Sequence, residues 1–272
     1  MKIIVSDLDY TLLKDNMDVG KETSTYLNNL NNNEYMFVPC SSRSIDDLVN
    51  GIKDINTHYC VCSNGATIYN NKTKQVIDTK YLETNIAKEI LTILKDIKFA
   101  TTIVLNNIVY SDPILRDVYE YNNLDKDKIE KIFIHRTFNK DINNILDDNK
   151  LIEKLHLNFF NIEDQKEAMH RVLIHCNNNY YITNSSTLNL EITNIEANKG
   201  KAINRLCNIL NINNPNIIAF GDNLNDKSLL GIANIKVAMN NAVDELKDIA
   251  TVINPYTNDQ EGVVKYLKDI NF

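Results

Sequence analysis

Short apolar runs that end in polar turns recur along the chain, and segments with helical spacing separate several of them. Alternating strands and helices of this kind fold as a parallel sheet with helices on both faces. The pattern therefore predicts an α/β, Rossmann-like doubly wound parallel sheet. We expect its strands at about 3–5, 35–38, 59–62 and 217–220, and helices at about 21–31 and 44–52. A further helix is expected to open within 196–201 and to run to about 210.

The pattern changes between about residues 82 and 187. A predicted helix at 85–97 is followed by strand-like segments that pair through Asn106-Asn107, and a second long helix is expected at 163–176. Helical and strand-like segments are expected around 132–137 and 155–160, and further strands near 180 and 188. We predict an inserted α+β cap domain over 82–187, within a catalytic core formed by 1–81 and 188–272.

Polar side chains follow three of the predicted core strands where each strand ends. The first turn reads Asp7-Leu-Asp-Tyr-Thr11, the second carries Ser41 and Ser42 before Arg43, and the third reads Gly221-Asp-Asn-Leu-Asn-Asp226. Any one of them could be an ordinary acidic turn or a helix cap. Two acidic turns in one parallel sheet are harder to dismiss, because parallel strands bring their carboxyl ends to a common edge.

The residue types at this predicted edge suit phosphoryl transfer. Asp7, Asp9, Asp222 and Asp226 would repel one another, and Mg²⁺, which prefers oxygen ligands, would relieve that repulsion. Serine hydroxyls and the ammonium of Lys199 could hold the remaining phosphoryl oxygens. Positioning and charge neutralisation carry most of the catalysis in such reactions.

Overall charge and composition narrow the range of partners. The net charge is −7 and the sequence pI is about 5.3, so nucleic acid and anionic membrane surfaces would repel the chain at long range. We find neither a signal peptide nor an apolar stretch that could span a membrane. The 5 cysteines are expected to be reduced, which favours a cytoplasmic protein. The sequence leaves the oligomeric state open.

Taken in order, these motifs resemble the four motifs of the haloacid dehalogenase superfamily of phosphohydrolases. They are Asp7-Leu-Asp-Tyr-Thr11, the hydroxyl turn before Arg43, Lys199-Gly and the turn from Gly221 to Asp226. The resemblance spans almost the whole chain. Ser63-Asn-Gly-Ala66 ahead of the inserted segment, with Asn241-Ala242 and Glu261-Gly-Val263 after it, is similar to the Cof-type branch with a type IIB cap.

This resemblance implies a role for each site residue. Asp7 would be the nucleophile, and Asp9 would protonate the leaving oxygen and then activate water. Mg²⁺ would be held by Asp7, the main-chain carbonyl of Asp9 and Asp222. Ser41, Ser42, Lys199 and Asn225 would bind the phosphoryl group or balance its charge, and Thr11 and Asp226 would support the site.

Two departures from the family pattern affect these assignments. Members often have Gly where Tyr10 stands, and Thr-Gly-Arg where Ser41-Ser42-Arg43 stands. Whether Ser41 or Ser42 presents the phosphoryl-binding hydroxyl therefore stays open.

We expect a Mg²⁺-dependent phosphatase of small phosphorylated metabolites that works through an aspartyl-phosphate. Sugar phosphates are the first candidates, ahead of pyridoxal phosphate and flavin nucleotides. A phosphomutase of the same superfamily is the enzymatic alternative. A receiver-like protein that accepts a phosphoryl group without turnover is the non-enzymatic alternative, although the long insertion and the Asp7/Asp9 pair argue against it.

Overall fold

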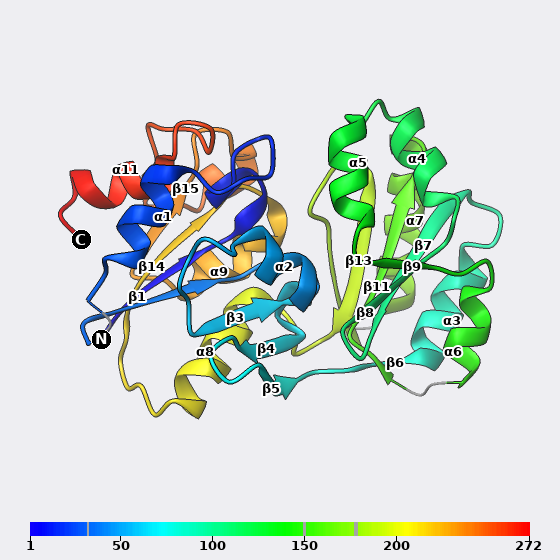
Figure 1. The fold of residues 1–272 in the computed structure, drawn as a ribbon. Coiled ribbons are helices and arrows are strands. Elements are labelled where there is room, and N and C mark those ends of the chain that lie inside the picture. The colour runs from blue at the N-terminus through cyan, green and yellow to red at the C-terminus, as the bar shows by residue number, and fades with distance from the viewer. Residues whose placement is uncertain (32, 149–150, 177–178) are drawn as a thin grey trace. The chain divides into compact units, whose positions relative to one another are not determined.

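The computed structural model describes residues 1–31, 33–148, 151–176 and 179–272, and it divides into two compact units. The first unit comprises Met1–Asp78 and Asn198–Phe272, and the second is the inserted segment Thr79–Ala197. Figure 1 shows the ribbon of both units.

The first unit is built on a five-stranded parallel sheet with the order β16-β15-β14-β1-β2. Ile3, Ile4 and Val5 of the first strand are fully buried, because helices cover the sheet on both faces. The expected doubly wound α/β fold is confirmed. The strands are β1 (Lys2–Ser6), β2 (Tyr35–Pro39), β14 (Asn216–Gly221), β15 (Ile235–Ala238) and β16 (Val252–Ile253).

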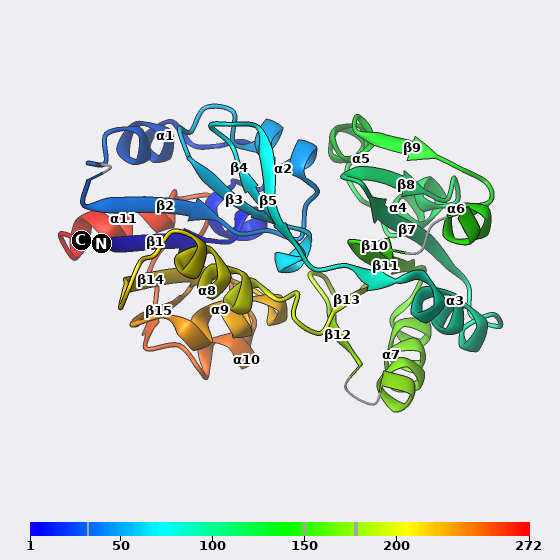
Figure 2. The same cartoon turned by 90° about the horizontal axis from the view of Figure 1, so that it is seen from below.

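Two pairs of helices form the layers on this sheet. α1 packs against α11, and α8 packs against α9 on the opposite face (Figure 2). Ser44 caps the next helix after α1 by accepting a hydrogen bond from the backbone N–H of Asp47, as its sequence predicts. The helices are α1 (Lys21–Asn28), α2 (Ile45–Gly51), α8 (Lys199–Ile209), α9 (Lys227–Ile232), α10 (Asp244–Lys247) and α11 (Gly262–Asp269).

Strand order places the polar turns together. β1 lies between β14 and β2 and runs parallel to both, with Ser6 opposite Phe220 on one side and Pro39 on the other. All three strands therefore end at the same level. The turns that carry Asp7, Ser41 and Asp222 therefore all begin at this edge of the sheet, as the rule for parallel strands predicts.

The strand predicted at 59–62 forms, but it does not extend the large sheet as expected. β3 (Tyr59–Cys62) pairs antiparallel with β4 (Thr67–Asn70), which pairs with β5 (Gln75–Thr79) in a separate three-stranded sheet. A single parallel bridge between Cys40 and Val61 joins it to the end of β2. The sequence pattern of an apolar strand does not show which sheet the strand joins, and β3 has a local partner in β4.

The second unit is an α+β structure around a six-stranded sheet with the order β12-β13-β11-β7-β8-β9. One face packs on α3, α6 and α7 through Ile103, Leu155, Leu157 and Ile192. Its strands are β7 (Phe99–Leu105), β8 (Ile108–Ser111), β9 (Arg136–Phe138), β11 (Lys154–Phe159), β12 (Tyr180–Thr183) and β13 (Asn189–Asn194).

Other elements complete this unit. α4 and α5 pack over Ala100 on the other face of the sheet, and Asn106-Asn107 forms the expected turn between β7 and β8. β6 (Leu82–Glu83) and β10 (Leu151–Ile152) pair as a small ladder. The helices are α3 (Thr84–Ile93), α4 (Leu115–Tyr121), α5 (Lys126–Phe133), α6 (Ile142–Asp148) and α7 (Ile162–Cys176).

The limits of the inserted unit differ from the predicted 82–187. The segment 188–197 belongs to the insertion, because β13 pairs antiparallel with both β11 and β12. Leu190 and Ile192 of that strand are buried in the second unit's apolar core. The pattern of an apolar strand before Lys199 is compatible with either sheet. This is why the sequence alone assigned the strand to the catalytic core.

Two further expectations can be compared with the structure. Cys40, Cys60, Cys62 and Cys207 are buried free thiols, as predicted, while the side chain of Cys176 lies outside the described residues. Within the described part of the chain, every helix is too short or too polar to cross a membrane.

Candidate active site

Asp7 stands directly after β1, at the start of a tight turn over Leu8–Leu12. Its side chain is buried, and its backbone N–H donates to the carbonyl of Phe220 in β14. Tyr10 in this turn has a φ of 59°, a left-handed conformation that glycine adopts without strain. Tyr at this position therefore carries a conformational cost that glycine would not.

The turn after β14 is built around Asp226. One of its carboxylate oxygens accepts hydrogen bonds from the backbone N–H groups of Asp222 and Asn223, at 3.0 and 3.2 Å. A Cβ on Gly221 would lie 2.5 Å from the Cβ of Asp226, so only glycine allows the turn to close this tightly. This tight turn holds Asp222 at the sheet edge, where one of its carboxylate oxygens accepts a hydrogen bond from the Thr11 hydroxyl at 2.8 Å.

Lys199 is fully buried at the first position of α8 and bridges two acids. Its Nζ lies 2.7 Å from Oδ1 of Asp7 and 2.6 Å from Oδ1 of Asp226. The next residue, Gly200, allows this placement, because a Cβ there would collide with the backbone carbonyl of Ser228 in α9. Burial alone would lower the pKa of Lys199, but Asp226 and Asp7 raise it, so the ammonium stays charged.

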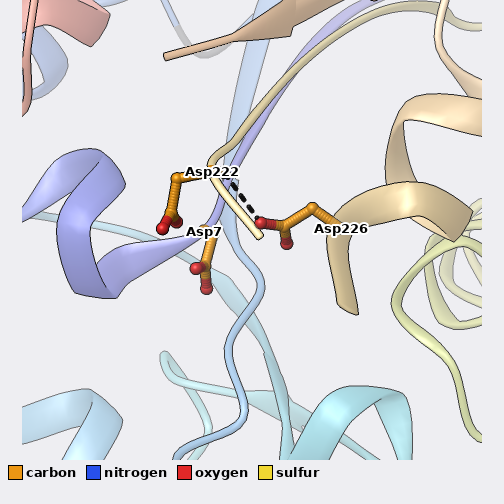
Figure 3. A group of neighbouring side chains, drawn as sticks. All are labelled: Asp7, Asp222 and Asp226. Carbon is orange, nitrogen blue, oxygen red and sulfur yellow. Dashed lines mark hydrogen bonds between the residues drawn. The ribbon is translucent and has the colours of Figure 1, made fainter. Parts of the chain in front are cut away.

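Asp7, Asp222 and Asp226 form an acidic cluster in which one carboxylate oxygen from each lies within 4.8 Å of the others. Figure 3 shows the three side chains converging from the two turns. Burial and the neighbouring acids raise the pKa of Asp7 to about 7, against the opposing effect of Lys199. Burial, Asp7 and Asp226 also raise the pKa of Asp222 well above its ordinary value. Fully ionised, the cluster would carry more negative charge than Lys199 balances, which is why these two pKa values rise.

This excess of buried negative charge fits a divalent cation. Lys199 binds one oxygen of Asp7, and Thr11 binds one oxygen of Asp222. The second oxygen of each carboxylate is open among the described residues. Both oxygens of Asp226 are engaged, one by Lys199 and the other by backbone N–H groups. Asp7 and Asp222 are therefore the side chains suited to hold a hard cation such as Mg²⁺, with Asp226 orienting Lys199.

The hydroxyl turn after β2 presents Ser41 more deeply than Ser42. Ser41 is buried, and its Oγ accepts a hydrogen bond from the Arg43 backbone N–H at 3.2 Å, whereas Ser42 is half-buried. The Ser41 hydroxyl keeps its own proton to donate. This geometry favours Ser41 as the phosphoryl-binding hydroxyl.

Asp9 is not part of the acidic cluster. Its two carboxylate oxygens accept hydrogen bonds from Nε and Nη2 of Arg43, and 36% of its side chain is exposed. That its main-chain carbonyl holds Mg²⁺ stays a prediction. The sequence showed Arg43 within the second motif but gave no sign that its guanidinium would reach Asp9.

One further residue at this edge was not predicted. Asn64 is buried in the turn after β3, and its Oδ1 accepts a hydrogen bond from Nδ2 of Asn225 at 3.3 Å. The sequence Asn64-Gly65 predicted a turn after this strand. It did not show that Asn64 would contact Asn225. The predicted residues Thr11, Lys199, Asp222 and Asp226 do meet around Asp7.

The model of one protein family matches residues 4–267, and its description is haloacid dehalogenase-like hydrolase. The chain belongs to this family. That result confirms the family predicted from the four motifs.

Solved structures and a curated relative agree with this assignment. A haloacid dehalogenase-like hydrolase from B. subtilis matches with a TM-score of 0.87 at 24% identity, covering 98% of this chain and 99% of its own. The subclass IIB sugar phosphatase BT4131 matches with a TM-score of 0.77 at 17% identity, covering 100% and 99%.

The relative is YwtE of Bacillus subtilis (strain 168), a 5-amino-6-(5-phospho-D-ribitylamino)uracil phosphatase. It is 31% identical over 129 residues, which cover 47% of this chain and 44% of its own length. Family membership and these names support the prediction of a phosphoric monoester hydrolase.

Proposed function

We propose that this haloacid dehalogenase-like hydrolase is a Mg²⁺-dependent phosphatase that forms an aspartyl-phosphate on Asp7. Its substrates are small phosphorylated metabolites, with sugar phosphates as the leading class. The observation that carries the proposal is the acidic cluster itself: Asp7 is buried beside Asp222 and Asp226 and has Lys199 at 2.7 Å. Few structural needs bring three buried acids together, whereas phosphoryl transfer with a cation requires such a group.

In the first half of the reaction, a carboxylate oxygen of Asp7 attacks phosphorus and the bond from phosphorus to the ester oxygen breaks. Lys199 and the Ser41 hydroxyl bind the non-bridging phosphoryl oxygens. Asp7 and Asp222 would hold Mg²⁺, which supplies positive charge to the phosphoryl oxygens and keeps the nucleophile ionised. Asp226 keeps the Lys199 ammonium in place through its 2.6 Å contact.

Asp9 handles the proton in both halves. It donates to the departing ester oxygen, then takes a proton from the water that attacks phosphorus, so that inorganic phosphate leaves and the carboxylate of Asp7 is restored. Arg43 binds both oxygens of Asp9 in this structure. Asp9 must therefore turn at least one oxygen away from Arg43 before it can act.

We further propose that the inserted unit selects the substrate. A row of polar side chains crosses four strands of its sheet, formed by Glu191, His156, Thr102 and Ser111. Glu191, Thr102 and Ser111 are fully buried or nearly so. Such a row is costly in a small domain unless it has a ligand or a network to satisfy it.

Thr102 and Ser111 bond each other and Lys154 donates to Glu191, but His156 is not fully hydrogen-bonded. Nε2 of His156 is buried without a hydrogen-bond partner within the described residues. The same is true of Nδ2 of Asn158, two residues further along β11. Burial and the charges of Lys154 and Arg136 lower the pKa of His156 to about 3, so the ring is neutral. A neutral ring and an amide can donate to or accept from the hydroxyl groups of a sugar or polyol.

The substrates of the two named relatives fit the same class. BT4131 is a sugar phosphatase, and the YwtE substrate carries a phosphorylated ribityl chain, which is a polyol. We infer that this chain also acts on the phosphate ester of a polyhydroxylated metabolite. Buried free cysteines suit a reducing compartment, so we place the reaction in the cytoplasm.

The experiment is a phosphate-release assay on a panel of sugar and polyol monophosphates, run with Mg²⁺, with EDTA, and with Mg²⁺ restored. We expect Mg²⁺-dependent release of inorganic phosphate that EDTA abolishes and Mg²⁺ recovers. Activity that persists in EDTA would contradict the metal dependence.

The alternatives predict different products. A phosphomutase would convert one sugar phosphate into its isomer without releasing phosphate, which chromatography of the reaction mixture detects. A receiver-like protein would retain a stable acyl-phosphate and show no turnover. Either result would replace the proposed function.

A further inference from the structure

The turn Ser63-Asn64-Gly65 has an unusual backbone. All three residues adopt a positive φ, of 50°, 56° and 93°, and the first two are almost completely buried. Serine rarely adopts this conformation, and asparagine does so at some cost, so the turn is conformationally unfavourable. Backbone strain of this kind persists only where surrounding contacts hold it in place.

Those contacts join the turn to the edge that carries the acidic cluster. The backbone N–H of Asn64 donates to the carbonyl of Ser41 at 3.0 Å, and its Oδ1 accepts from Nδ2 of Asn225 at 3.3 Å. Gly65 lies against the carbonyl of Asn198, so closely that a Cβ would collide with it. The turn thus touches the Ser41 turn, the residue before Lys199 and the Asn225 turn.

The contact with Asn225 determines how its amide is oriented. Asn225 is 3% exposed and lies between Asp222 and Asp226 in sequence. Because Asn64 binds Nδ2, the other amide atom, Oδ1, is fixed as an acceptor, and it is buried without a hydrogen-bond partner within the described residues. A buried acceptor left open in this way is satisfied by a bound water, hydroxyl or cation.

We propose that Asn64 is a positioning residue that fixes the Asn225 amide, so that Asn225 Oδ1 accepts from the water shell of a divalent cation at the acidic cluster. This role would replace the phosphoryl-binding role that the motif implied for Asn225. The inference rests on the proposed function for its meaning in catalysis. Cation binding itself can be measured without turnover.

The test is the Asn64→Gly variant. Glycine adopts the positive φ readily and keeps the N–H that binds Ser41, so only the side-chain amide is lost. Asn211→Gly is the matched control, because Asn211 is also left-handed, with a φ of 55°, and is exposed. It lies beyond the last residue of α8, whose first residue, Lys199, reaches the site.

The measurement is the dissociation constant for Mn²⁺, obtained from the electron paramagnetic resonance signal of free Mn²⁺ without substrate. We expect Asn64→Gly to weaken Mn²⁺ binding by about 3- to 10-fold, the range for one lost hydrogen bond, and Asn211→Gly to leave it unchanged. Asn225→Ala should weaken it similarly. The double variant Asn64→Gly/Asn225→Ala should be no weaker than Asn225→Ala alone, because Asn64 acts through Asn225.

A purely structural role would give additive losses in the double variant, or a lower Tm with unchanged Mn²⁺ affinity, and either result would overturn the proposal. Asn64→Asp provides a second test that does not depend on the glycine variant folding. Aspartate tolerates the left-handed backbone and keeps an oxygen for Asn225. It should bind Mn²⁺ at least as tightly as the wild type, and weakened binding would contradict the proposal.

Failure here is separable from failure of the proposed function. If Mn²⁺ affinity behaves as expected but no phosphate is released from any substrate, Asn64 positions Asn225 in a site with another activity. If phosphate is released and Asn64→Gly binds Mn²⁺ like the control, the phosphatase stands and the role of Asn64 is wrong.

Discussion

Both carboxylate oxygens of Asp9 are bound by Arg43, while Asp7, two residues earlier, is buried against Lys199. The two acids therefore have different environments within a single turn. One is buried in the acidic cluster and the other is partly exposed. This asymmetry suits one nucleophile and one proton carrier, because the carrier must reach both the leaving group and water.

Replacement of Asp9 by Asn should therefore affect substrates unequally. We expect kcat on a sugar phosphate to fall by roughly 100-fold or more, since general acid and base catalysis contributes about that much. An aryl phosphate, whose leaving group needs little protonation, should lose less in its first step. Equal losses in single-turnover cleavage of the two substrates would show that Asp9 is not the leaving-group acid.

The raised pKa of Asp7, about 7 against an ordinary 3.8, links the site to stability. The folded state holds this proton more tightly than the unfolded chain, so its stabilising contribution is complete below about pH 4 and is lost as the pH rises through 7. In EDTA, we expect Tm to fall between about pH 5.5 and pH 8, and to fall less in Asp7→Asn.

Asp244→Asn is the control for this effect, because the Asp244 side chain is 96% exposed. It should show the same pH dependence of Tm as the wild type. If Asp7→Asn also keeps the full wild-type dependence, burial does not raise the pKa of Asp7 in the metal-free protein.

Close approach between elements is what brings Lys199 to the acids. α8 and α9 pack through Gly200, which lies against the backbone carbonyl of Ser228. Backbone atoms cannot move aside as a flexible side chain can. The packing of two helices in the first unit therefore depends on a position where no side chain fits.

Gly200→Ala should be destabilising by about 1–3 kcal/mol, the usual cost of overpacking, and should lower activity by displacing Lys199. Gly231→Ala is the matched control in α9, because a Cβ there meets no atom within 4 Å. It should raise stability by about 0.5 kcal/mol, as alanine favours helix more than glycine does. Chemical denaturation of both variants measures the difference, and equal stabilities would contradict the packing argument.

Much of the first unit could be predicted because its rules are local. An apolar strand, an acidic turn and a helix follow one another at Asp7 and again at Asp222, and parallel pairing then requires the two turns to meet. The pairing of Asp9 with Arg43 and of Asn64 with Asn225 could not be predicted in this way. Each pair depends on the direction of side chains in turns that are distant in sequence. The hydrophobic pattern of the chain carries no information about those directions.

At the scale of the whole molecule, our proposal assigns the chemistry to the first unit and substrate selection to the inserted unit. The acidic cluster lies entirely in the unit formed by Met1–Asp78 and Asn198–Phe272. The inserted unit Thr79–Ala197 has its own apolar core and a buried polar row. The predicted end of the insertion at 187 was too early because strand pattern does not show which sheet a strand joins.

Excising Thr79–Ala197 and joining Asp78 to Asn198 with a short flexible linker should separate the two functions. We expect the remaining core to bind Mg²⁺ and to hydrolyse a small aryl phosphate, while discrimination among sugar phosphates collapses. The measurement is the ranking of kcat/KM over a substrate panel, after a cooperative melt has shown that the core folds. A core that ranks the panel as the intact protein does would place specificity in the first unit.

Covalent transfer of the phosphoryl group to Asp7 is the central claim, and trapping with borohydride tests it most directly, because borohydride reduces an aspartyl-phosphate to homoserine. Asp9→Asn with an aryl phosphate is the suitable enzyme and substrate, since the first step needs little acid and the second lacks its base. Mass spectrometry of the quenched protein should find homoserine at position 7, dependent on substrate and Mg²⁺. Turnover with unmodified Asp7, or modification at another carboxylate, would contradict the account.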